Sequence, residues 1–233
     1  MVVKPTTVGE EAGARRVDRR RAILDAATEL FADRGFGAVS VQEIADAAST
    51  HKTTVLYHFA TKEALHEAVL DEALGRIAAV MHEFLAGGFR RDRVAYMLDQ
   101  IHAFFADHIA LARILQRELL ESAAPEAYFS LFVEPIYLPA MRMLEAAMAA
   151  GVIRHVDPAL FIHDLHVQLI GYFCHRPFIE RLKPGDPLSV EALIARREHL
   201  VSQIFRQLTP DGAEDFHLPS AAAFVVSTQE QMP

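Results

Sequence analysis

The chain is 233 residues long, 52% of them hydrophobic, and carries a formal net charge of −8. This length suits one or two domains with a proper core. The single cysteine, Cys174, excludes an intrachain disulfide and fits a reducing cytosol. The sequence lacks a signal peptide and an apolar run of about 18 residues, so we expect a cytoplasmic protein with no membrane partner.

Two helical patterns open the N-terminal third of the chain. The first has one apolar stripe, formed by Ile23, Ala26, Ala27, Leu30 and Phe31. Gly35 and Gly37 end this helix, because glycine adopts the left-handed cap conformation at low cost. Ser40 and Glu43 have the spacing of a capping box, which predicts the start of a second helix.

A tight polar turn, Ala48-Ser49-Thr50, separates the second helix from a third. In the third helix Val55 and Phe59 are four residues apart and can face the same core, which leaves its other faces free. Two short helices set at an angle form a helix-turn-helix, which lays its second helix in the major groove of DNA. The pattern therefore predicts a DNA-reading module.

The rest of the chain predicts helices with short breaks and no alternating strands. The expected helices cover about residues 61–85, 92–108, 111–121, 126–150, 158–174 and 190–208. Pro135 and Pro139 should kink or split the fourth of these, and Asp157-Pro158 should start the fifth. The predicted fold class is all-α, with an N-terminal three-helix helix-turn-helix domain and a C-terminal helical domain.

This reading divides the chain into four parts. They are a mobile N-terminal arm (1–14), a helix-turn-helix domain (15–62), a helical ligand-binding and dimerisation domain (63–208) and a mobile tail (209–233). The apolar segment 221–226 could still dock. The first 62 residues hold nine Lys/Arg and eight Asp/Glu, and the remaining residues hold fourteen Lys/Arg and twenty-three Asp/Glu. The acidic surplus therefore lies outside the helix-turn-helix domain, which we call the reader.

The reader resembles the N-terminal pattern of the tetracycline-repressor (TetR) family of bacterial transcription regulators. The matching residues are Ser40, Ile44-Ala45, Ala48, Lys52, Thr54, Tyr57-His58-Phe59 and Lys62-Glu63-Ala64-Leu65. The match covers about a fifth of the chain and keeps its spacing throughout. The resemblance implies a repressor that binds a palindromic operator in double-stranded DNA as a homodimer and leaves it when a small molecule binds.

The resemblance and the exposed positions together give a set of expected DNA-binding residues. They are Arg20, Arg21, Ser40, Thr50, His51, Lys52, Thr53, Thr54, Leu56, Tyr57, His58 and Lys62. Ser40, Thr54, Tyr57 and Lys62 match family positions that hold the DNA backbone. His51, Lys52, Thr53 and Leu56 occupy the early turns of the third helix, where base edges can be read.

The chain departs from the family pattern at the turn and at the base-reading positions. Ser49 replaces glycine, which predicts a left-handed backbone at a cost of roughly 1–2 kcal/mol. Leu56 stands in place of the commoner tyrosine, and His51 and Thr53 also differ from the pattern. These changes affect which operator is read rather than the DNA-binding role itself.

Five arginines between residues 15 and 21 lie at the leading edge of the reader, where they could meet phosphate. The alternative is a solvated, arginine-rich helix start. Positive charge is mildly unfavourable at a helix N-terminus, which weakens this purely structural account.

For the C-terminal part the resemblance implies a ligand pocket and a dimer interface. Aromatic and polar side chains of the middle helices are pocket candidates, with core packing as the more common role of such residues: Phe104, His108, Tyr128, Phe132, Tyr137, His166 and Tyr172. The last two long helices would pair with those of a second copy, with Leu193, Leu200 and Ile204 at the interface. The alternative is that these residues all belong to the core of one chain. Aromatic abundance favours an apolar or aromatic effector.

No cofactor and no metal are expected. His163 and His166 share a helical face, but zinc needs three or four converging ligands, and no paired zinc motif occurs. Cys174 is expected to be a buried apolar thiol. The alternatives to a repressor are an activator, a ligand-free DNA-binding protein, or an all-helical enzyme with an incidental helix-turn-helix. No nucleophile elbow, phosphate loop or dinucleotide fingerprint supports the enzyme.

Overall fold

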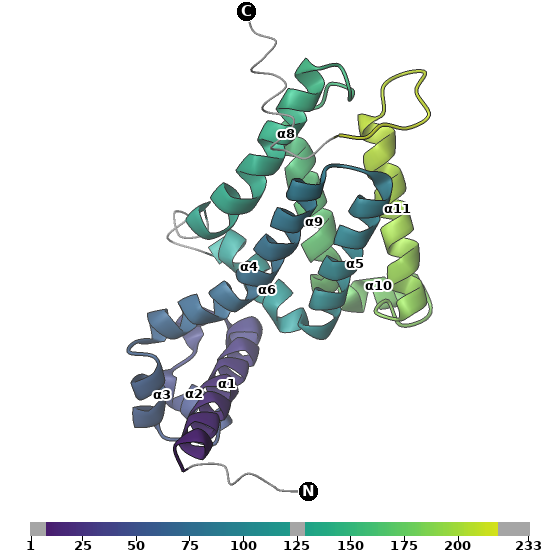
Figure 1. The fold of residues 1–233 in the computed structure, drawn as a ribbon. Coiled ribbons are helices and arrows are strands. Elements are labelled where there is room, and N and C mark those ends of the chain that lie inside the picture. Colours follow the sequence, from purple (N-terminus) through teal and green to yellow (C-terminus); the bar gives the residue numbers. More distant parts are fainter. Residues whose placement is uncertain (1–7, 122–128, 219–233) are drawn as a thin grey trace, which may run out of the picture. The chain divides into compact units, whose positions relative to one another are not determined.

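The computed structural model describes residues 8–121 and 129–218, and the chain divides into two compact units, residues 1–73 and 74–233 (Figure 1). The described secondary structure is helical, apart from one isolated antiparallel bridge. The boundary between the units falls inside a long helix, α4 (Lys62–Gly87), eleven residues after the boundary expected at residue 62.

The N-terminal unit is a small helical module with its own core. It contains α1 (Val8–Arg34), the short 3-10 helix η1 (Phe36–Ala38), α2 (Val41–Ala47), α3 (Lys52–His58) and the first half of α4. The predicted stripe of α1 packs inward, with Ile23 and Ala27 fully buried. Val55 and Phe59 are also buried, as their four-residue spacing predicts. The predicted helix-turn-helix is therefore present.

Helix α1 begins earlier than the sequence pattern indicates. It starts at Val8, within the segment 1–14 that was expected to be a mobile arm. The segment from Gly9 to Arg16 is rich in Glu, Ala and Arg, which favour helix even without an apolar stripe. Helical periodicity is visible only where a helix has a core to face, so this extension left no pattern to read.

The C-terminal unit packs helices around a second core. It contains the second half of α4, α5 (Arg91–Asp107), α6 (Ile109–Glu121), η2 (Phe129–Tyr137), α8 (Leu138–Ala149), α9 (Pro158–Cys174), α10 (Arg176–Leu182) and α11 (Val190–Leu208). Helix α9 lies against α6 and α8, and α11 lies against α5 (Figure 1).

Prolines shape three helix boundaries in the C-terminal unit. The helix predicted over 126–150 is split into the π-helical segment η2, which contains Pro135, and α8, which has Pro139 in its first turn. Each proline lacks the N–H that a continuous α-helix would need. Residues 126–128 lie outside the described part. Pro177 follows the end of α9 and lies in the first turn of α10, a position that proline favours.

The segment after α11 is docked rather than loose, at least as far as it is described. Leu218 pairs with Phe89 through two backbone hydrogen bonds of 2.9 and 2.8 Å, and its side chain is 2% exposed. Phe216 stacks on Phe89, and Asp215 accepts a hydrogen bond from Arg91 at 3.0 Å. The prediction of a mobile tail from residue 209 is therefore wrong for 209–218. Residues 219–233, with the apolar segment 221–226, lie outside the described residues.

No helix in the described ranges is both long and apolar enough to cross a membrane.

Candidate DNA-reading surface and effector cavity

The capping box that starts α2 is formed as predicted. Ser40 Oγ accepts a hydrogen bond from Glu43 N at 3.3 Å, and Glu43 Oε2 accepts one from Ser40 N at 2.8 Å. The hydrogen bonds from Ser40, followed by that from Arg34, lower the pKa of Glu43 to about 2. Glu43 is therefore ionised at neutral pH and holds the N-terminus of α2 in place.

The turn between α2 and α3 requires a left-handed residue. Ser49 has a φ of 50°, as expected for the position where the family pattern has glycine. Thr50 N donates to Ala45 O at 2.8 Å and Ser49 N donates to Asp46 O at 3.1 Å, the pair of hydrogen bonds that defines a Schellman cap. Ser49 lies at the position that glycine usually takes in this cap, and it sets the direction in which α3 leaves the turn.

Helix α3 presents a polar face and one apolar side chain to solvent. His51, Lys52 and Thr53 are exposed, while Thr54 and His58 are partly buried. Leu56 is 38% exposed and Tyr57 is 71% exposed. Leu56 therefore lies on the outward face, where it was expected. Of the residues from 51 to 56, only Val55 is buried, and the other five lie at least partly exposed on or beside one short helix.

Arginines of α1 lie beside this face. The guanidinium of Arg16 is 5.7 Å from the ring centre of Tyr57, and that of Arg20 is 5.0 Å from the ring centre of Phe59. Arg19 Nη1 donates to Ser49 O at 3.3 Å. None of these three has a carboxylate partner in the described part of the chain, so their charge is available to an anion.

The same cluster affects a neighbouring histidine. Burial, followed by the positive charges of Arg16, Arg20 and Arg19, lowers the pKa of His58. The imidazole is thereby favoured in its neutral form, which can still donate one hydrogen bond.

Arg21 and Lys62 are engaged inside the unit, which revises their expected roles. Arg21 forms ion pairs with Asp25 at 2.8 Å and with Glu72 at 2.5 Å, so its charge is already neutralised. Lys62 Nζ donates to Phe36 O and Val39 O, both at 3.0 Å. These contacts argue against a phosphate contact for Arg21 and give Lys62 a structural task that the sequence did not indicate. A phosphate contact through the remaining N–H of Lys62 stays a prediction.

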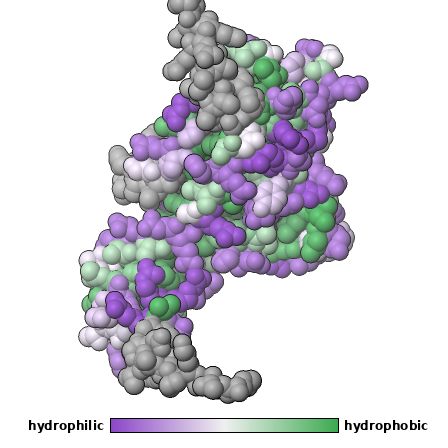
Figure 2. Space-filling view, viewed as in Figure 1, coloured by the Kyte–Doolittle hydropathy of each residue, from purple (hydrophilic) through white to green (hydrophobic). Residues whose placement is uncertain are grey.

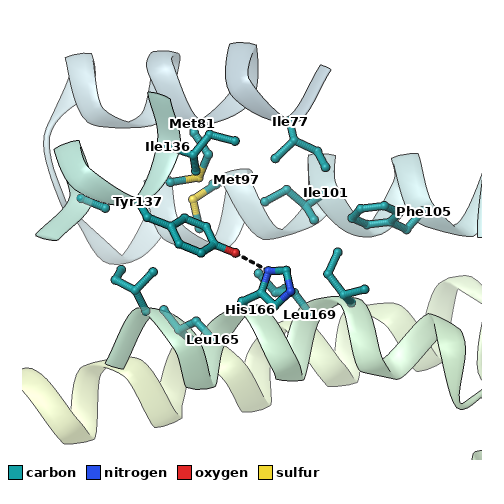
Figure 3. A pocket seen from close by; sticks show the side chains of 13 residues that line it. Ile77, Met81, Met97, Ile101, Phe105, Ile136, Tyr137, Leu165, His166 and Leu169 are labelled. Carbon is teal, nitrogen blue, oxygen red and sulfur yellow. Dashed lines mark hydrogen bonds between the residues drawn. The ribbon is translucent and has the colours of Figure 1, made fainter. Parts of the chain in front are cut away.

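The C-terminal unit contains an apolar cavity of about 90 Å³ (Figure 3). Its wall is built from four parts of the chain: Ile77 and Met81 of α4, Met97, Ile101 and Phe105 of α5, Ile136, Tyr137 and Ala140 of η2 and α8, and Ile162, Leu165, His166, Leu169 and Ile170 of α9. Only Tyr137 and His166 bring polar side-chain atoms to this wall.

Tyr137 and His166 point toward each other across the cavity and are hydrogen-bonded through Tyr137 Oη and His166 Nδ1 (Figure 3). Burial, followed by the charge of His163, lowers the pKa of His166 to about 4. The imidazole is therefore neutral at pH 7. We call these two residues the Tyr137–His166 pair.

A second, larger space of about 550 Å³ lies against an adjoining face of α9. We call it the outer groove; its lining comes from α6, η2, α8, α9 and the residue that follows α9. The lining residues are Gln116, Leu119, Leu120, Tyr137, Met141, Ala159, Ile162, His163, His166, Val167, Ile170, Gly171 and His175.

The pocket prediction is only partly matched by these spaces. Tyr137 and His166 line both of them. Phe104 and His108 stack on each other instead, with ring centres 4.8 Å apart, and Tyr172 donates to Pro187 O at 2.8 Å outside both spaces. Tyr128 lies outside the described residues, and of Phe132 only the backbone is described. The aliphatic and methionine residues of the cavity wall were missed, because their spacing does not distinguish a cavity wall from a filled core.

Two of the three expected interface residues belong to the core of this chain. Leu200 is 0% exposed and Ile204 is 2% exposed, because this face of α11 packs against α5. Only Leu193 is partly accessible. The prediction that Leu200 and Ile204 contact a second copy is therefore wrong, and the alternative of an intrachain core holds for them.

The apolar residues that are exposed lie elsewhere. Figure 2 shows hydrophobic surface gathered over α10 and the neighbouring start of α11, at the right of the view. The exposed apolar side chains there are Phe178, Leu182, Val190 and Ile194.

A second buried histidine lies in this unit without a partner. His102 is 1% exposed, and neither ring nitrogen has a hydrogen-bond partner in the described part of the chain. Burial, followed by the positive charge of Arg196, lowers the pKa of His102 to about 4.

Titratable groups do not converge into a metal site in the ranges described: no group of three His, Cys, Asp or Glu residues is close enough to hold an ion. Burial raises the pKa of Cys174 to about 11, so its thiol is protonated at neutral pH and is a poor nucleophile.

The described geometry defines a helix-turn-helix DNA-binding protein with a helical second unit. A sequence profile described as "Bacterial regulatory proteins, tetR family" matches residues 23–69. The chain is 33% identical over 181 residues to the HTH-type transcriptional repressor KstR2 of Rhodococcus jostii (strain RHA1), which covers 75% of this chain and 85% of that relative. The chain therefore belongs to the TetR family and is a DNA-binding transcriptional regulator.

Solved structures share its fold. The ketosteroid transcriptional regulator KstR2 of Mycobacterium tuberculosis superposes with a TM-score of 0.65 at 21% identity, over 83% of this chain and 96% of that one. The fatty acid degradation regulator FadR of Bacillus halodurans does so with a TM-score of 0.59 at 18% identity, over 81% and 97%. At these identities the likeness concerns the fold, and it confirms the predicted two-part, all-helical architecture.

Proposed function

We propose that the protein represses transcription as a homodimer on a palindromic operator and is released by an apolar small molecule bound in the C-terminal unit. The observation that carries this proposal is the cavity of about 90 Å³, which is apolar except for one hydrogen-bonded pair. Sites for small molecules have this composition: mostly apolar walls with a few placed polar groups. One structural relative is named a ketosteroid regulator, which agrees with an apolar effector.

The coupling between effector and DNA would run through α4. This helix begins at Lys62, which is bonded to the N-terminal unit, and later contributes Ile77 and Met81 to the cavity wall. A molecule that enters the cavity must displace part of that wall. A coupling of about 1–3 kcal/mol would lower DNA affinity roughly 5–150-fold.

We propose that α3 reads the operator. Lys52 can donate to guanine, and the exposed Leu56 and the Thr53 methyl group can contact a thymine methyl group. The phosphates would be contacted by side chains that border the same face, namely Arg16, Arg19, Arg20, Ser40, Thr54 and Tyr57.

We propose that two copies associate through the exposed apolar face of α10 and α11, defined by Phe178, Leu182, Val190 and Ile194. A palindromic operator needs two readers about one helical turn, roughly 34 Å, apart. Contiguous exposed apolar surface on a protein of this kind marks an interaction site.

A binding-site selection from random duplexes, followed by gel retardation, tests the DNA-reading role. We expect an inverted repeat. At one T·A pair in each half-site, replacing thymine by uracil removes only the methyl group and should cost the wild type roughly 1 kcal/mol, the lower end of the range for a single base pair. The variant Leu56→Ala should be indifferent to the same replacement. If both proteins respond equally to uracil at every position, Leu56 does not read DNA.

We also propose that the protein has no catalytic role and acts in the cytoplasm, where its DNA target lies. Its family relatives are named regulators. An effector recovered chemically unchanged after release of the DNA supports this, whereas turnover of the effector contradicts it.

A further inference from the structure

The Tyr137–His166 pair lies where the cavity and the outer groove meet. Both spaces are lined by the same four residues, Tyr137, Ile162, His166 and Ile170. Of these four, only the pair carries polar side-chain atoms, and they are hydrogen-bonded to each other (Figure 3). A molecule that occupied both spaces would therefore lie beside this hydrogen bond.

The sizes of the two spaces restrict what can lie in each. The cavity of about 90 Å³ is smaller than an apolar cavity of roughly 150 Å³ that accepts benzene, so it takes only a small hydrocarbon end. Met81 and Met97 in its wall are flexible and can make some room. The outer groove, at about 550 Å³, lies within the usual range of about 300–1,000 Å³ for ligand sites. The larger part of a ligand thus belongs outside.

The lining also restricts the charge of the ligand. Neither lining includes a Lys, Arg, Asp or Glu side chain among the described residues. Because His166 is neutral at pH 7, the pair itself offers a carboxylate no positive charge, so removing a carboxylate from water there is costly. The two other histidines of the lining, His163 and His175, belong to the outer groove. A carbonyl or hydroxyl oxygen could instead accept a hydrogen bond from Tyr137 or His166 at a small desolvation cost.

The outer groove offers a further polar contact. Gln116 lines it, and its Oε1 atom is buried with no hydrogen-bond partner in the described ranges. Such an acceptor costs free energy until a donor reaches it. Rotation of the amide would turn this oxygen toward a hydroxyl or N–H group of a molecule in the groove.

We propose that the Tyr137–His166 pair is an oxygen-recognising gate, and that the effector is an uncharged molecule with a short hydrocarbon end in the cavity, a carbonyl or hydroxyl oxygen at the pair, and its larger part in the outer groove. The role of this molecule as an effector rests on the proposed function; its binding does not. The ligand oxygen replaces the bond between the two side chains, so a ligand without that oxygen loses the bond and gains nothing in return.

A cycle of two ligands and two proteins tests the gate by calorimetry without DNA. The probes are methyl nonyl ketone and the alkene in which a methylene group replaces its oxygen. Their intrinsic difference in hydration cancels when the affinity ratio of ketone to alkene is compared between proteins. We expect Tyr137→Phe to lower this ratio roughly 3–10-fold, the effect of one hydrogen bond.

Tyr172→Phe is the matched control, because it removes a hydroxyl that bonds to Pro187 O outside both spaces. It should leave the ratio unchanged within about twofold, because the partly buried Tyr172 lines neither space. Thermal unfolding of each variant establishes that it is folded. An equal ratio in the wild type and Tyr137→Phe overturns the gate.

The anion undecanoate, with the same number of carbons as the ketone, tests the charge. We expect it to bind the wild type at least tenfold more weakly than the ketone; equal or tighter binding overturns the uncharged class. Gel retardation is measured separately. If the calorimetric cycle holds but the ketone leaves operator binding unchanged, release by this class of molecule is contradicted while the gate stands.

Discussion

The substitution Ser49→Gly should stabilise the protein, because Ser49 holds a conformation that suits glycine. Its φ of 50° places it in the left-handed region, and its side chain is exposed to solvent. The two hydrogen bonds of the turn use the backbone N–H groups of Ser49 and Thr50, and Arg19 bonds to the backbone oxygen of Ser49. Glycine keeps all of these contacts.

The expected gain is the difference between two terms. The left-handed conformation costs a residue with a Cβ atom roughly 1–2 kcal/mol, which glycine avoids. Glycine is more flexible when unfolded, which costs about 0.5–1 kcal/mol. The free energy of unfolding should therefore rise by about 0.75 kcal/mol, the difference between the midpoints of the two ranges. For a chain of this size that shifts Tm by about 1–4 °C.

Far-UV circular dichroism during thermal and urea unfolding measures the effect, since the chain contains no tryptophan. Ser49→Ala keeps the Cβ atom and should stay within about 0.5 kcal/mol of the wild type. Ser202→Gly, in the exposed interior of α11, should lose about 0.5–1 kcal/mol, because glycine is unfavourable within a helix. If Ser49→Gly is no more stable than the wild type while Ser202→Gly behaves as expected, the left-handed turn is refuted.

Three further predictions concern a buried histidine, a partly buried lysine and the apolar face proposed for dimerisation. Because the pKa of His102 is about 4 in the folded state and about 6.5 in the unfolded state, unfolding takes up a proton at His102 between these two pH values. The contribution of His102 to stability is therefore complete above about pH 6.5 and is lost as the pH falls toward 4. In urea titrations, His102→Phe should reduce the dependence of the unfolding free energy on pH in this range by up to about 1.4 kcal/mol per pH unit, and an unchanged dependence would reject the assignment. Lys62→Met removes two hydrogen bonds from a charged donor and should cost about 2–3 kcal/mol in the same assay, whereas Lys52→Met, at an exposed site, should cost less than about 0.5 kcal/mol. In sedimentation velocity, Ile194→Glu should give a monomer, whereas Tyr96→Glu, at an exposed position of α5, should give the proposed dimer. If both variants are dimers, the face of α10 and α11 is not the dimer interface.

The reader could be predicted from sequence because its determinants are local. The capping box needs only Ser40 and Glu43, three residues apart. The left-handed turn is expected at Ser49 because the family pattern has glycine at this position. The burial of Val55 and the exposure of Leu56 follow from the period of a single helix. Each of these signals lies within one or two turns of the residue that it describes.

The cavity and the interface could not be predicted in the same way, because they depend on which helices meet. The stripe that contains Leu200 and Ile204 was correctly identified as apolar, but its partner is α5 of the same chain. The cavity wall combines residues from α4 to α9, separated by up to 93 positions between Ile77 and Ile170. Apolar periodicity shows that a face is buried and does not show what covers it.

Arg20 and Arg21 show that the pairing of a charged side chain also depends on residues distant in the sequence. They are adjacent in the sequence, which gives no reason to separate them, and both are predicted to contact phosphate. The structure gives Arg21 a carboxylate from α4, Glu72, which is 51 positions away, while the guanidinium of Arg20 lies over the ring of Phe59 and keeps its charge. An arginine that is already paired would have to exchange one anion for another when DNA binds, whereas an unpaired arginine releases counterions and gains affinity. The positive charge that the N-terminal unit offers to DNA is therefore set by which arginines α4 leaves unpaired, and the same helix contributes Ile77 and Met81 to the cavity wall.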